Sequence, residues 1–240
     1  IVASSKKKVT VLTDVKNFTT YTNSESHCIV KCGNTFWDCK TNMGVVECEA
    51  VDGAIVSVST PVVPNSPVRN YCEYMKFTAA DKLLVAGGNI NYFGLPENDH
   101  DGTLMEFNVK YDRWNNITAD SIISVTGLKY SNMCSIDEDP TRPGHYFAGS
   151  FGYGVCEFMN GRFVQHYDFE NSPLESAVPG KRKYVRVPTV MFDKDGNLWC
   201  VNTTNIADVI KVLKKDGEWV SLKYKDIEYM ETMVKPYIDS

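Results

Sequence analysis

The chain has 240 residues, of which 43% are hydrophobic, 12% aromatic and 23% charged, with 25 basic against 30 acidic side chains. That balance is typical of a folded globular protein and excludes a disordered tail, a collagen-like chain and a coiled coil. The net charge of −5 argues against a dedicated nucleic-acid binder, which usually carries a basic excess. No apolar run approaches the roughly 20 residues of a membrane-spanning helix, so none is expected.

A fourfold repeat organises the sequence. Residues 35–48 and 145–158 both read as an aromatic pair, six residues, and then Gly-Val-x-Glu. A period of about 50 residues is typical of arrays whose unit is a small sheet, such as propeller blades. The insertion 91–101 accounts for the longest of the three spacings, which are 47, 63 and 52 residues. The equivalent anchor residues in the four copies are Trp37, Leu84, Phe147 and Trp199.

Each repeat predicts four short antiparallel strands joined by tight turns. Asp52-Gly53 and Asn160-Gly161 fall between strand-like segments, and such dipeptides are strong hairpin signals. The fold class is therefore predicted to be all-β, a β-propeller. A β-sandwich is the alternative, but it does not explain the repeated register. The predicted blades are 27–60, 69–119, 132–169 and 188–224, with partial-blade strands at 9–21 and 235–239 in a single segment 1–240.

The two partial blades leave the ends of the array open to two interpretations. Either the chain is a fragment of a larger multi-domain protein, or its two ends complete one composite blade and close the ring. An open ring would expose unpaired strand edges and apolar faces, which is unfavourable. We expect a fragment with about four full blades.

The repeat resembles that of the two-component-regulator propeller proteins of Bacteroidetes. Residues 192–199 read Phe-Asp-Lys-Asp-Gly-Asn-Leu-Trp, similar to that group's Asp-x-x-Gly-x-Leu/Ile-Trp hairpin. Within the group the chain resembles the PorZ-like proteins, which are associated with the type IX secretion system. This likeness runs over about residues 66–224. It rests on the segments 69–70, 83–88, 102–105, 147–154 and 171–174.

The resemblance implies a non-enzymatic protein of the periplasm or the cell surface, with tandem propellers and a further C-terminal domain outside this chain. We therefore expect a binding or scaffold module that contacts a protein or glycan partner in the bacterial envelope, without nucleic acid and without a cofactor. The same blades occur in hybrid two-component sensors, whose periplasmic propellers respond to oligosaccharides. Such a sensor is the alternative function.

No catalytic or metal-binding constellation is predicted. Ser150 lies in a sequence that resembles a nucleophile elbow, but it aligns with a strand position of the first repeat and no helix follows. Residues 193–197 begin like a calcium loop, yet the Gly and Glu of an EF-hand are not in their places, so a hairpin turn is predicted. Histidines without ligand spacing, expected on the surface or hydrogen-bonded within strands, are His27, His100, His145 and His166.

Two loops that depart from the repeat are the predicted binding regions. The insertion 91–101 carries aromatic side chains, and loops on a rigid repeat scaffold commonly carry specificity. The alternative is that the insertion arose by neutral sequence drift and has no binding role, because loop insertions cost little stability. The connector 173–183 ends in a basic run suited to an anionic glycan or partner. The candidate binding residues are Tyr92, Phe93, Asp99, His100, Lys181, Arg182 and Lys183.

Eight cysteines are too few for a disulfide scaffold and contain no Cys-x-x-Cys pair, so zinc is not expected. One or two disulfides are compatible with the sequence, but spacing does not assign them. Cys39, Cys156 and Cys200 fall on predicted strands, where packing is the expected role. The others are Cys28, Cys32, Cys48, Cys72 and Cys134.

Overall fold

Two compact units make up the chain. The structure, a computed structural model, describes residues 1–5, 8–14, 16–23, 25–41, 43–88, 90, 100–128, 130–203 and 205–229. Contacts between Cα atoms divide the chain into Ile1–Asn65 and Ser66–Ser240. The sequence analysis treated residues 1–240 as one segment, whereas this division falls between its first and second repeats. The segment around the boundary carries Pro61, Pro64 and Pro67, which cannot donate to a ladder.

The first unit consists of two antiparallel sheets. Its three-stranded sheet has the order β1-β2-β3, and its four-stranded sheet has the order β4-β5-β6-β7. Asp52 and Gly53 have positive φ angles of 48° and 78° at the β6–β7 turn, as the Asp-Gly signal predicts. The strands are β1 (Val2–Ser5), β2 (Lys8–Leu12), β3 (Phe18–Thr22), β4 (Ser26–Cys32), β5 (Thr35–Lys40), β6 (Gly44–Val51) and β7 (Ala54–Ser57).

The second unit is a stack of three antiparallel sheets, with orders β11-β10-β9-β8, β12-β13-β14-β15 and β17-β18-β19-β20. The short strand β16 (Val185–Arg186) pairs with β13. The first two sheets contain β8 (Tyr74–Phe77), β9 (Lys82–Ala86), β10 (Leu104–Asn108), β11 (Arg113–Ile117), β12 (Met133–Glu138), β13 (His145–Gly152), β14 (Gly154–Met159) and β15 (Arg162–Tyr167). The third contains β17 (Thr189–Phe192), β18 (Leu198–Val201), β19 (Ile210–Leu213) and β20 (Trp219–Leu222).

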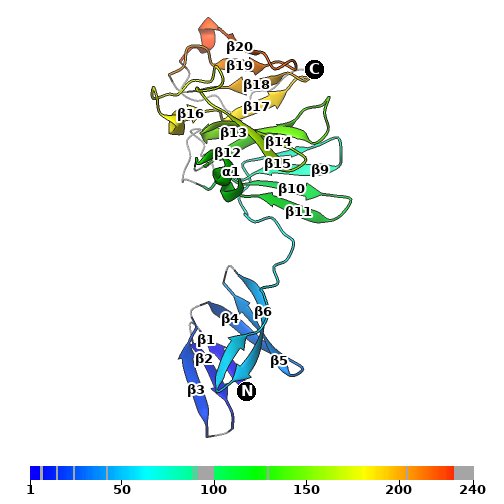
Figure 1. Cartoon of the computed structure of the whole chain (residues 1–240), viewed down its shortest axis with the longest axis vertical. Helices are drawn as coiled ribbons and strands as arrows, with labels where there is room; N and C mark the ends of the chain where they lie inside the picture. Colours follow the sequence, from blue (N-terminus) through cyan, green and yellow to red (C-terminus); the bar gives the residue numbers. More distant parts are fainter. Residues whose placement is uncertain are drawn as a thin grey trace. The chain divides into compact units, whose positions relative to one another are not determined.

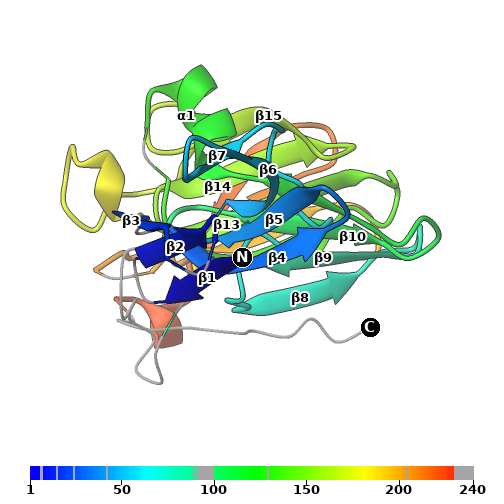
Figure 2. The same ribbon diagram turned by 90° about the horizontal axis from the view of Figure 1, so that it is seen from below.

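The stacking of these sheets is that of propeller blades. The first strand of the middle sheet, β12, contacts β8 and β9 on one side and β17 on the other. The sheet β12–β15 therefore lies between its two neighbours, as Figure 1 shows. Viewed along the vertical direction of Figure 1, β8, β9 and β10 lie side by side (Figure 2). Sheets of four antiparallel strands stacked in this way confirm the predicted all-β, propeller-type fold, here as an open, partial array.

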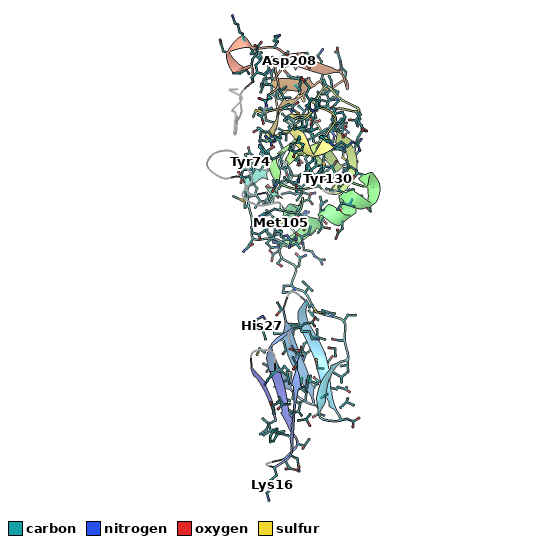
Figure 3. The ribbon with its side chains drawn as sticks, turned by 90° about the vertical axis from the view of Figure 1, so that its left-hand side faces the viewer. Lys16, His27, Tyr74, Met105, Tyr130 and Asp208 are labelled. Atoms are coloured by element: carbon teal, nitrogen blue, oxygen red, sulfur yellow. The ribbon has the colours of Figure 1, made fainter. Side chains whose placement is uncertain are left out.

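Two apolar clusters join the three sheets. The first cluster lies between β8–β11 and β12–β15 and contains Leu84, Leu104, Ile136 and Phe158, each 0–1% exposed. Tyr130 is fully buried in it, and Figure 3 shows this residue inside the unit. The second cluster lies between β12–β15 and β17–β20. Its members are Phe147, Val155, Leu174, Val185, Val187, Val190, Leu198 and Cys200.

The four four-stranded sheets correspond to the four predicted repeats, strand for strand. The predicted blade 188–224, for example, contains the four observed strands β17–β20. At the β14–β15 turn Asn160 and Gly161 have φ angles of 51° and 76°, as a tight hairpin requires. The predicted strand 235–239 lies outside the described residues.

Two local features differ from the sequence predictions. A helix, α1 (Ala119–Thr126), lies near β15 (Figure 2), where the sequence analysis placed none. Gly127, with φ 69°, ends this helix, and its N–H donates to the Ile123 carbonyl. The expectation that Cys39 packs in a core is wrong, because Cys39 is exposed, whereas Cys156 and Cys200 are buried as predicted.

Candidate functional site

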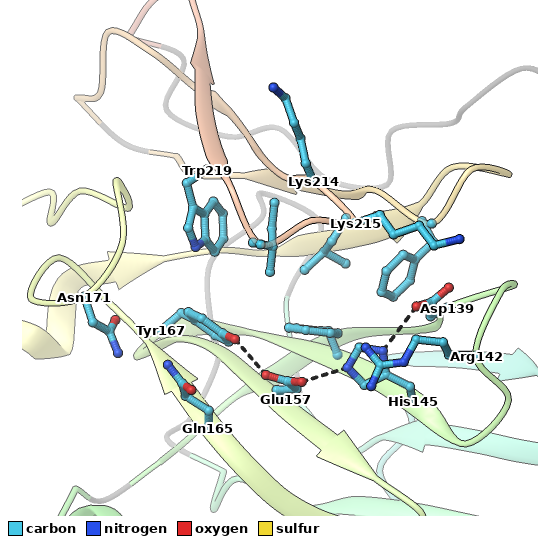
Figure 4. A pocket seen from close by; sticks show the side chains of 16 residues that line it. Asp139, Arg142, His145, Glu157, Gln165, Tyr167, Asn171, Lys214, Lys215 and Trp219 are labelled. Atoms are coloured by element: carbon cyan, nitrogen blue, oxygen red, sulfur yellow. Dashed lines mark hydrogen bonds and ion pairs between the residues drawn. The ribbon is translucent and has the colours of Figure 1, made fainter.

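A cleft of about 390 Å³ opens between the sheets β12–β15 and β17–β20 (Figure 4). We call it the interblade cleft. Residues of the β12–β13 turn and of β13–β15 form one wall, and the turns and strand ends of the last sheet form the other. Its lining residues are Asp139, Arg142, His145, Phe147, Glu157, Gln165, Tyr167, Asn171, Phe192, Gly196, Leu198, Leu213, Lys214, Lys215, Gly217 and Trp219.

A chain of hydrogen bonds runs along the floor of the cleft. The Nδ1 atom of His145 lies 3.2 Å from Asp139 Oδ2, and its Nε2 atom lies 2.7 Å from Glu157 Oε1. The Tyr167 hydroxyl donates to Glu157 Oε2 at 2.7 Å. Dashed lines in Figure 4 follow these contacts from Asp139 through His145 and Glu157 to Tyr167. Neighbouring strands β13, β14 and β15 position these side chains, since His145, Glu157 and Tyr167 each lie on one of them.

His145, the histidine in this hydrogen-bond network, lies between two carboxylates and two aromatic rings. His145 is only 5% exposed, and its ring lies edge-on to Phe147 at a centroid distance of 5.0 Å. The ring centroid of Phe192, from the facing sheet, lies 6.4 Å from that of His145. A protonated imidazole can donate to both carboxylates at once, whereas a neutral ring can donate to only one. His145 is therefore a hydrogen-bonded strand histidine, as the sequence analysis expected.

Both carboxyl groups are tuned to remain ionised. Burial alone would raise the pKa of Asp139, but hydrogen bonds from the Thr141 N–H and hydroxyl, both at 2.8 Å, outweigh burial and lower it. Burial likewise opposes ionisation of Glu157, but the hydrogen bonds from His145 and Tyr167 lower the pKa of this carboxyl. Burial and the adjacent Glu157 carboxylate raise the pKa of Tyr167, so its hydroxyl stays a proton donor.

Aromatic and polar side chains form the rim above this floor. The Trp219 indole packs edge-on against Tyr167 at 5.7 Å. The Lys214 ammonium is bound to Glu218 at 2.6 Å and points away from the other labelled side chains (Figure 4). Arg142, Gln165 and Lys215 are exposed. The rim can therefore offer an aromatic surface, amide groups and cationic groups to a bound molecule.

Of the predicted binding-loop residues, those that the structure describes (His100, Lys181, Arg182 and Lys183) are not among the residues that line this cleft. Tyr92, Phe93 and Asp99 lie outside the described residues. His100 is half-buried, its backbone N–H donates to Asn132 Oδ1 at 3.1 Å, and its ring lies 4.0 Å from that of Tyr71. These candidates stay predictions.

The basic run of the second loop is partly neutralised. The Arg182 guanidinium lies 2.9 Å from Asp168 Oδ2 and also contacts the Glu170 carboxylate. Lys181 and Lys183 are exposed on either side of it. Arg182 therefore anchors the connector to the end of β15, and the roles of Lys181 and Lys183 in binding stay predictions.

The other sequence motifs have structural roles. The Ser150 hydroxyl is fully buried and donates to the Ser131 carbonyl at 2.7 Å, so it is no exposed nucleophile. Asp193 Oδ1 accepts the backbone N–H groups of Asp195 and Asn197 at 3.0 and 2.9 Å. This is the predicted hairpin turn. Within the described part of the chain, no cluster of three or more His, Cys, Asp or Glu side chains is placed to hold a metal ion.

Sequence reasoning missed the cleft because its residues come from separate turns and strands of two repeats. Glu157 is the Glu of the repeated Gly-Val-x-Glu, which was used only to set the register. Trp219 and Tyr167 were predicted only as strand residues. The available signal was the spacing of Gln165 and Tyr167, which lie two positions apart and therefore on one face of the predicted strand.

Comparisons with known proteins identify the class of fold. No protein-family model and no curated protein matches the sequence. In the structural comparison, PorZ, an essential bacterial surface component of the type-IX secretion system of Porphyromonas gingivalis, is similar over 96% of this chain and 30% of its own. The TM-score is 0.75 and the identity is 19%. The chain is thus a propeller-type, all-β protein that spans under a third of PorZ.

Two more distant structures share only general features. The extracellular domain of a hybrid two-component system from B. thetaiotaomicron matches 82% of this chain and 25% of its own at a TM-score of 0.42 and 14% identity. Virginiamycin B lyase from Staphylococcus aureus matches 92% of this chain and 64% of its own at a TM-score of 0.43 and 12% identity. Neither likeness assigns an activity. None of the helices in the described residues has the length and apolar character to cross a membrane.

Proposed function

We propose that the chain is a non-catalytic binding module of a bacterial envelope or cell-surface protein of the PorZ-like kind, and that its ligand occupies the interblade cleft. One observation carries this proposal: an aromatic and polar rim lies above a floor whose titratable groups already bind one another. Such a cleft has the mixture of apolar surface and a few oriented polar groups that is typical of ligand sites.

The state of the floor favours binding over catalysis. A general acid or base that works near neutral pH needs a pKa close to that pH. The pKa values of Asp139 and Glu157 are lowered instead, which keeps both groups charged and paired with His145. The network therefore acts as a rigid support that holds Tyr167 and the strand ends in place.

The rim indicates how a partner would be held. Trp219 and Tyr167 offer ring surfaces for the apolar face of a sugar ring or of a protein side chain. Gln165 supplies an amide, and Arg142 and Lys215 supply charged donors. The propeller fold and the sequence resemblance support an envelope location and a protein or glycan partner. The loop residues of 91–101 and 181–183 are proposed as secondary contacts.

Binding to a panel of defined probes tests this function. Neutral oligosaccharides, uronic-acid oligosaccharides and acidic peptides are titrated into the full chain by calorimetry. We expect at least one class to bind, and the Trp219→Ala variant to bind it at least tenfold more weakly. The matched control is Trp114→Ala, which removes an indole from β11, outside the cleft.

Two results would contradict the proposal. Binding that is unchanged in Trp219→Ala would remove the cleft as the ligand site. Turnover of any probe by the wild-type chain would contradict the non-catalytic assignment. Deletion of residues 91–99 tests the loop separately, because unchanged affinity in that variant would remove the loop from the binding surface.

A further inference from the structure

Two exposed cysteines face each other across a hairpin of the first unit. Cys28 lies on β4 and Cys39 on β5, and the antiparallel register pairs their Cα positions directly. Both side chains are exposed and both thiols are free. We propose that Cys28 and Cys39 form an intramolecular disulfide when the protein meets a small-molecule disulfide such as oxidised glutathione. This inference does not depend on the proposed function, which concerns the other unit.

The register selects this pair among the eight cysteines. Directly opposed residues in an antiparallel pair have Cβ atoms about 4.5–5.5 Å apart, and a disulfide needs about 3.5–4.5 Å. Cys32 stands on the same strand as Cys28, four positions away, which is about 13 Å along a strand and too far to bridge. Cys32 is opposed by Thr35 instead. Cys48 is buried in the core of this unit, 1% exposed.

The local geometry allows the two strands to approach. The ladder between β4 and β5 is irregular between Ser26 and Cys28, so one extra residue, His27, interrupts the pairing next to Cys28. A bulge of this kind increases strand twist and frees the backbone beside it. β4 is also the edge strand of its sheet, hydrogen-bonded only to β5 within that sheet. A closure of about 1 Å therefore requires movement of a strand that is paired on one side only within its sheet.

The chemistry balances as two successive exchanges. The thiolate of one cysteine attacks a sulfur of oxidised glutathione, forms a mixed disulfide and releases one glutathione. The thiolate of the second cysteine attacks the protein sulfur of that mixed disulfide and releases the second glutathione. The net reaction converts two protein thiols and one glutathione disulfide into one protein disulfide and two glutathione thiols. Access for the attacking disulfide is available because both cysteines are exposed.

The consequence is a covalent clamp on the hairpin. Residues 29–38 would lie inside the closed loop, which contains the β4–β5 turn. The clamp removes conformations from the unfolded chain and prevents β4 from separating from β5. We expect the oxidised chain to unfold at a higher urea concentration than the reduced chain, without change in the second unit.

Peptide mapping of the full chain in glutathione buffers tests the proposal. Trypsin cleaves after Lys31 and Lys40, so it separates Cys28 from the peptide that holds Cys32 and Cys39. The Cys32→Ser variant leaves Cys39 as the only cysteine in that second peptide. We expect oxidised Cys32→Ser to lose two thiols, to lose the mass of two hydrogens, and to yield one linked pair of tryptic peptides that joins residues 28 and 39.

The matched single variants complete the test. In Cys28→Ser and Cys39→Ser the remaining partner is expected to stop at the mixed disulfide, with the mass of one bound glutathione and no linked pair of peptides, and these variants should show no rise in urea midpoint in the oxidising buffer. The proposal is overturned if Cys28 and Cys39 are both alkylated after oxidation, if either forms a stable link to Cys32, or if the linked species is a dimer on a non-reducing gel.

Discussion

The middle sheet of the second unit, β12–β15, and the four-stranded sheet of the first unit, β4–β7, have the same strand order but opposite burial. Every residue of β12 and β13 is buried. In β4, only Ser26 is buried and Ile29 is half-buried, while the other five residues are exposed. A sheet with neighbours on both faces buries both sets of alternating side chains, and a sheet covered on one face buries one set.

Burial on both faces has a chemical consequence. Polar residues that fall on β12 and β13, such as Asp137 and His145, must find partners inside the protein. Asp137 accepts the Phe192 N–H at 2.8 Å, and His145 binds Asp139 and Glu157. The network under the interblade cleft is therefore a result of the stacking, whereas in the lightly covered sheet β4–β7 the Ser26 hydroxyl and the Asp38 carboxylate form a smaller buried pair at 2.6 Å.

The largest expected effect comes from removing a core ring in the middle sheet. Phe158 is fully buried, and its ring centroid lies 5.4 Å from that of Tyr146 and 5.9 Å from that of Phe163. Phe158→Ala is expected to lower the free energy of unfolding by about 3–5 kcal/mol, because it leaves a cavity. Val30→Ala on β4, where the side chain is 57% exposed, is expected to change it by less than about 0.5 kcal/mol. Urea denaturation compares the two, and equal losses would contradict the difference between the sheets.

A glycine substitution at the β13–β14 connection comes next. Gly154 has φ +75°, and a Cβ there would overlap the Tyr167 carbonyl. Gly154→Ala is expected to lower the free energy of unfolding by about 2–3 kcal/mol, because of backbone strain and displacement of β15. Gly33, with φ +60° and no atom within 4 Å of the added Cβ, is the matched control in the first unit. There the loss should be about 1 kcal/mol, and a larger loss than in Gly154→Ala would contradict the close packing of β14 and β15.

The carboxylate network predicts a dependence of stability on pH. The folded-state pKa of Glu157 is below its unfolded value, so this group stabilises the fold above the unfolded pKa of about 4.3, and the contribution is lost as pH falls through the folded value. The urea midpoint is expected to fall between about pH 5 and pH 3. Glu157→Gln should cost about 1–2 kcal/mol at pH 7 and flatten this decline. A decline as steep as in the wild type would exclude Glu157 as a contributor.

The smallest effect is expected at the rim. Lys214 and Glu218 form an exposed pair at 2.6 Å, and such pairs contribute little. Lys214→Ala should leave the urea midpoint almost unchanged, because solvent screens an exposed pair. A loss comparable to that of Glu157→Gln would show that the rim and the floor of the cleft form one cooperative network.

The sequence predicted the strands well because their signals are local. The turns at Asp52-Gly53 and Asn160-Gly161 are encoded by residues that adopt positive φ, and the alternating apolar residues between turns define the strands. The helix at residues 119–126 was missed because only its end carries a clear signal, Gly127. The exposure of Cys39 was missed because a strand position alone does not tell which face is covered.

The cleft and the cysteine pair depend on non-local information. His145, Glu157 and Tyr167 meet because three strands lie in one register, and Trp219 reaches them from another sheet. Cys28 and Cys39 are opposed because the β4–β5 register, which begins with Cys32 opposite Thr35, continues unchanged to this pair and shifts only beyond it, at His27. A register slip of one residue would move a side chain to the other face of the sheet, and the register is known only from the structure.

Hydrogen exchange followed by mass spectrometry on the intact chain tests the central claim, that the second unit is a stack of blades with a doubly covered middle sheet that supports the cleft. We predict that the amides of β12, β13 and β14 exchange most slowly, and that those of β4 exchange at least tenfold faster under the same conditions. Exchange in β4 as slow as that in β13, or fast exchange throughout β12–β14, would contradict the account.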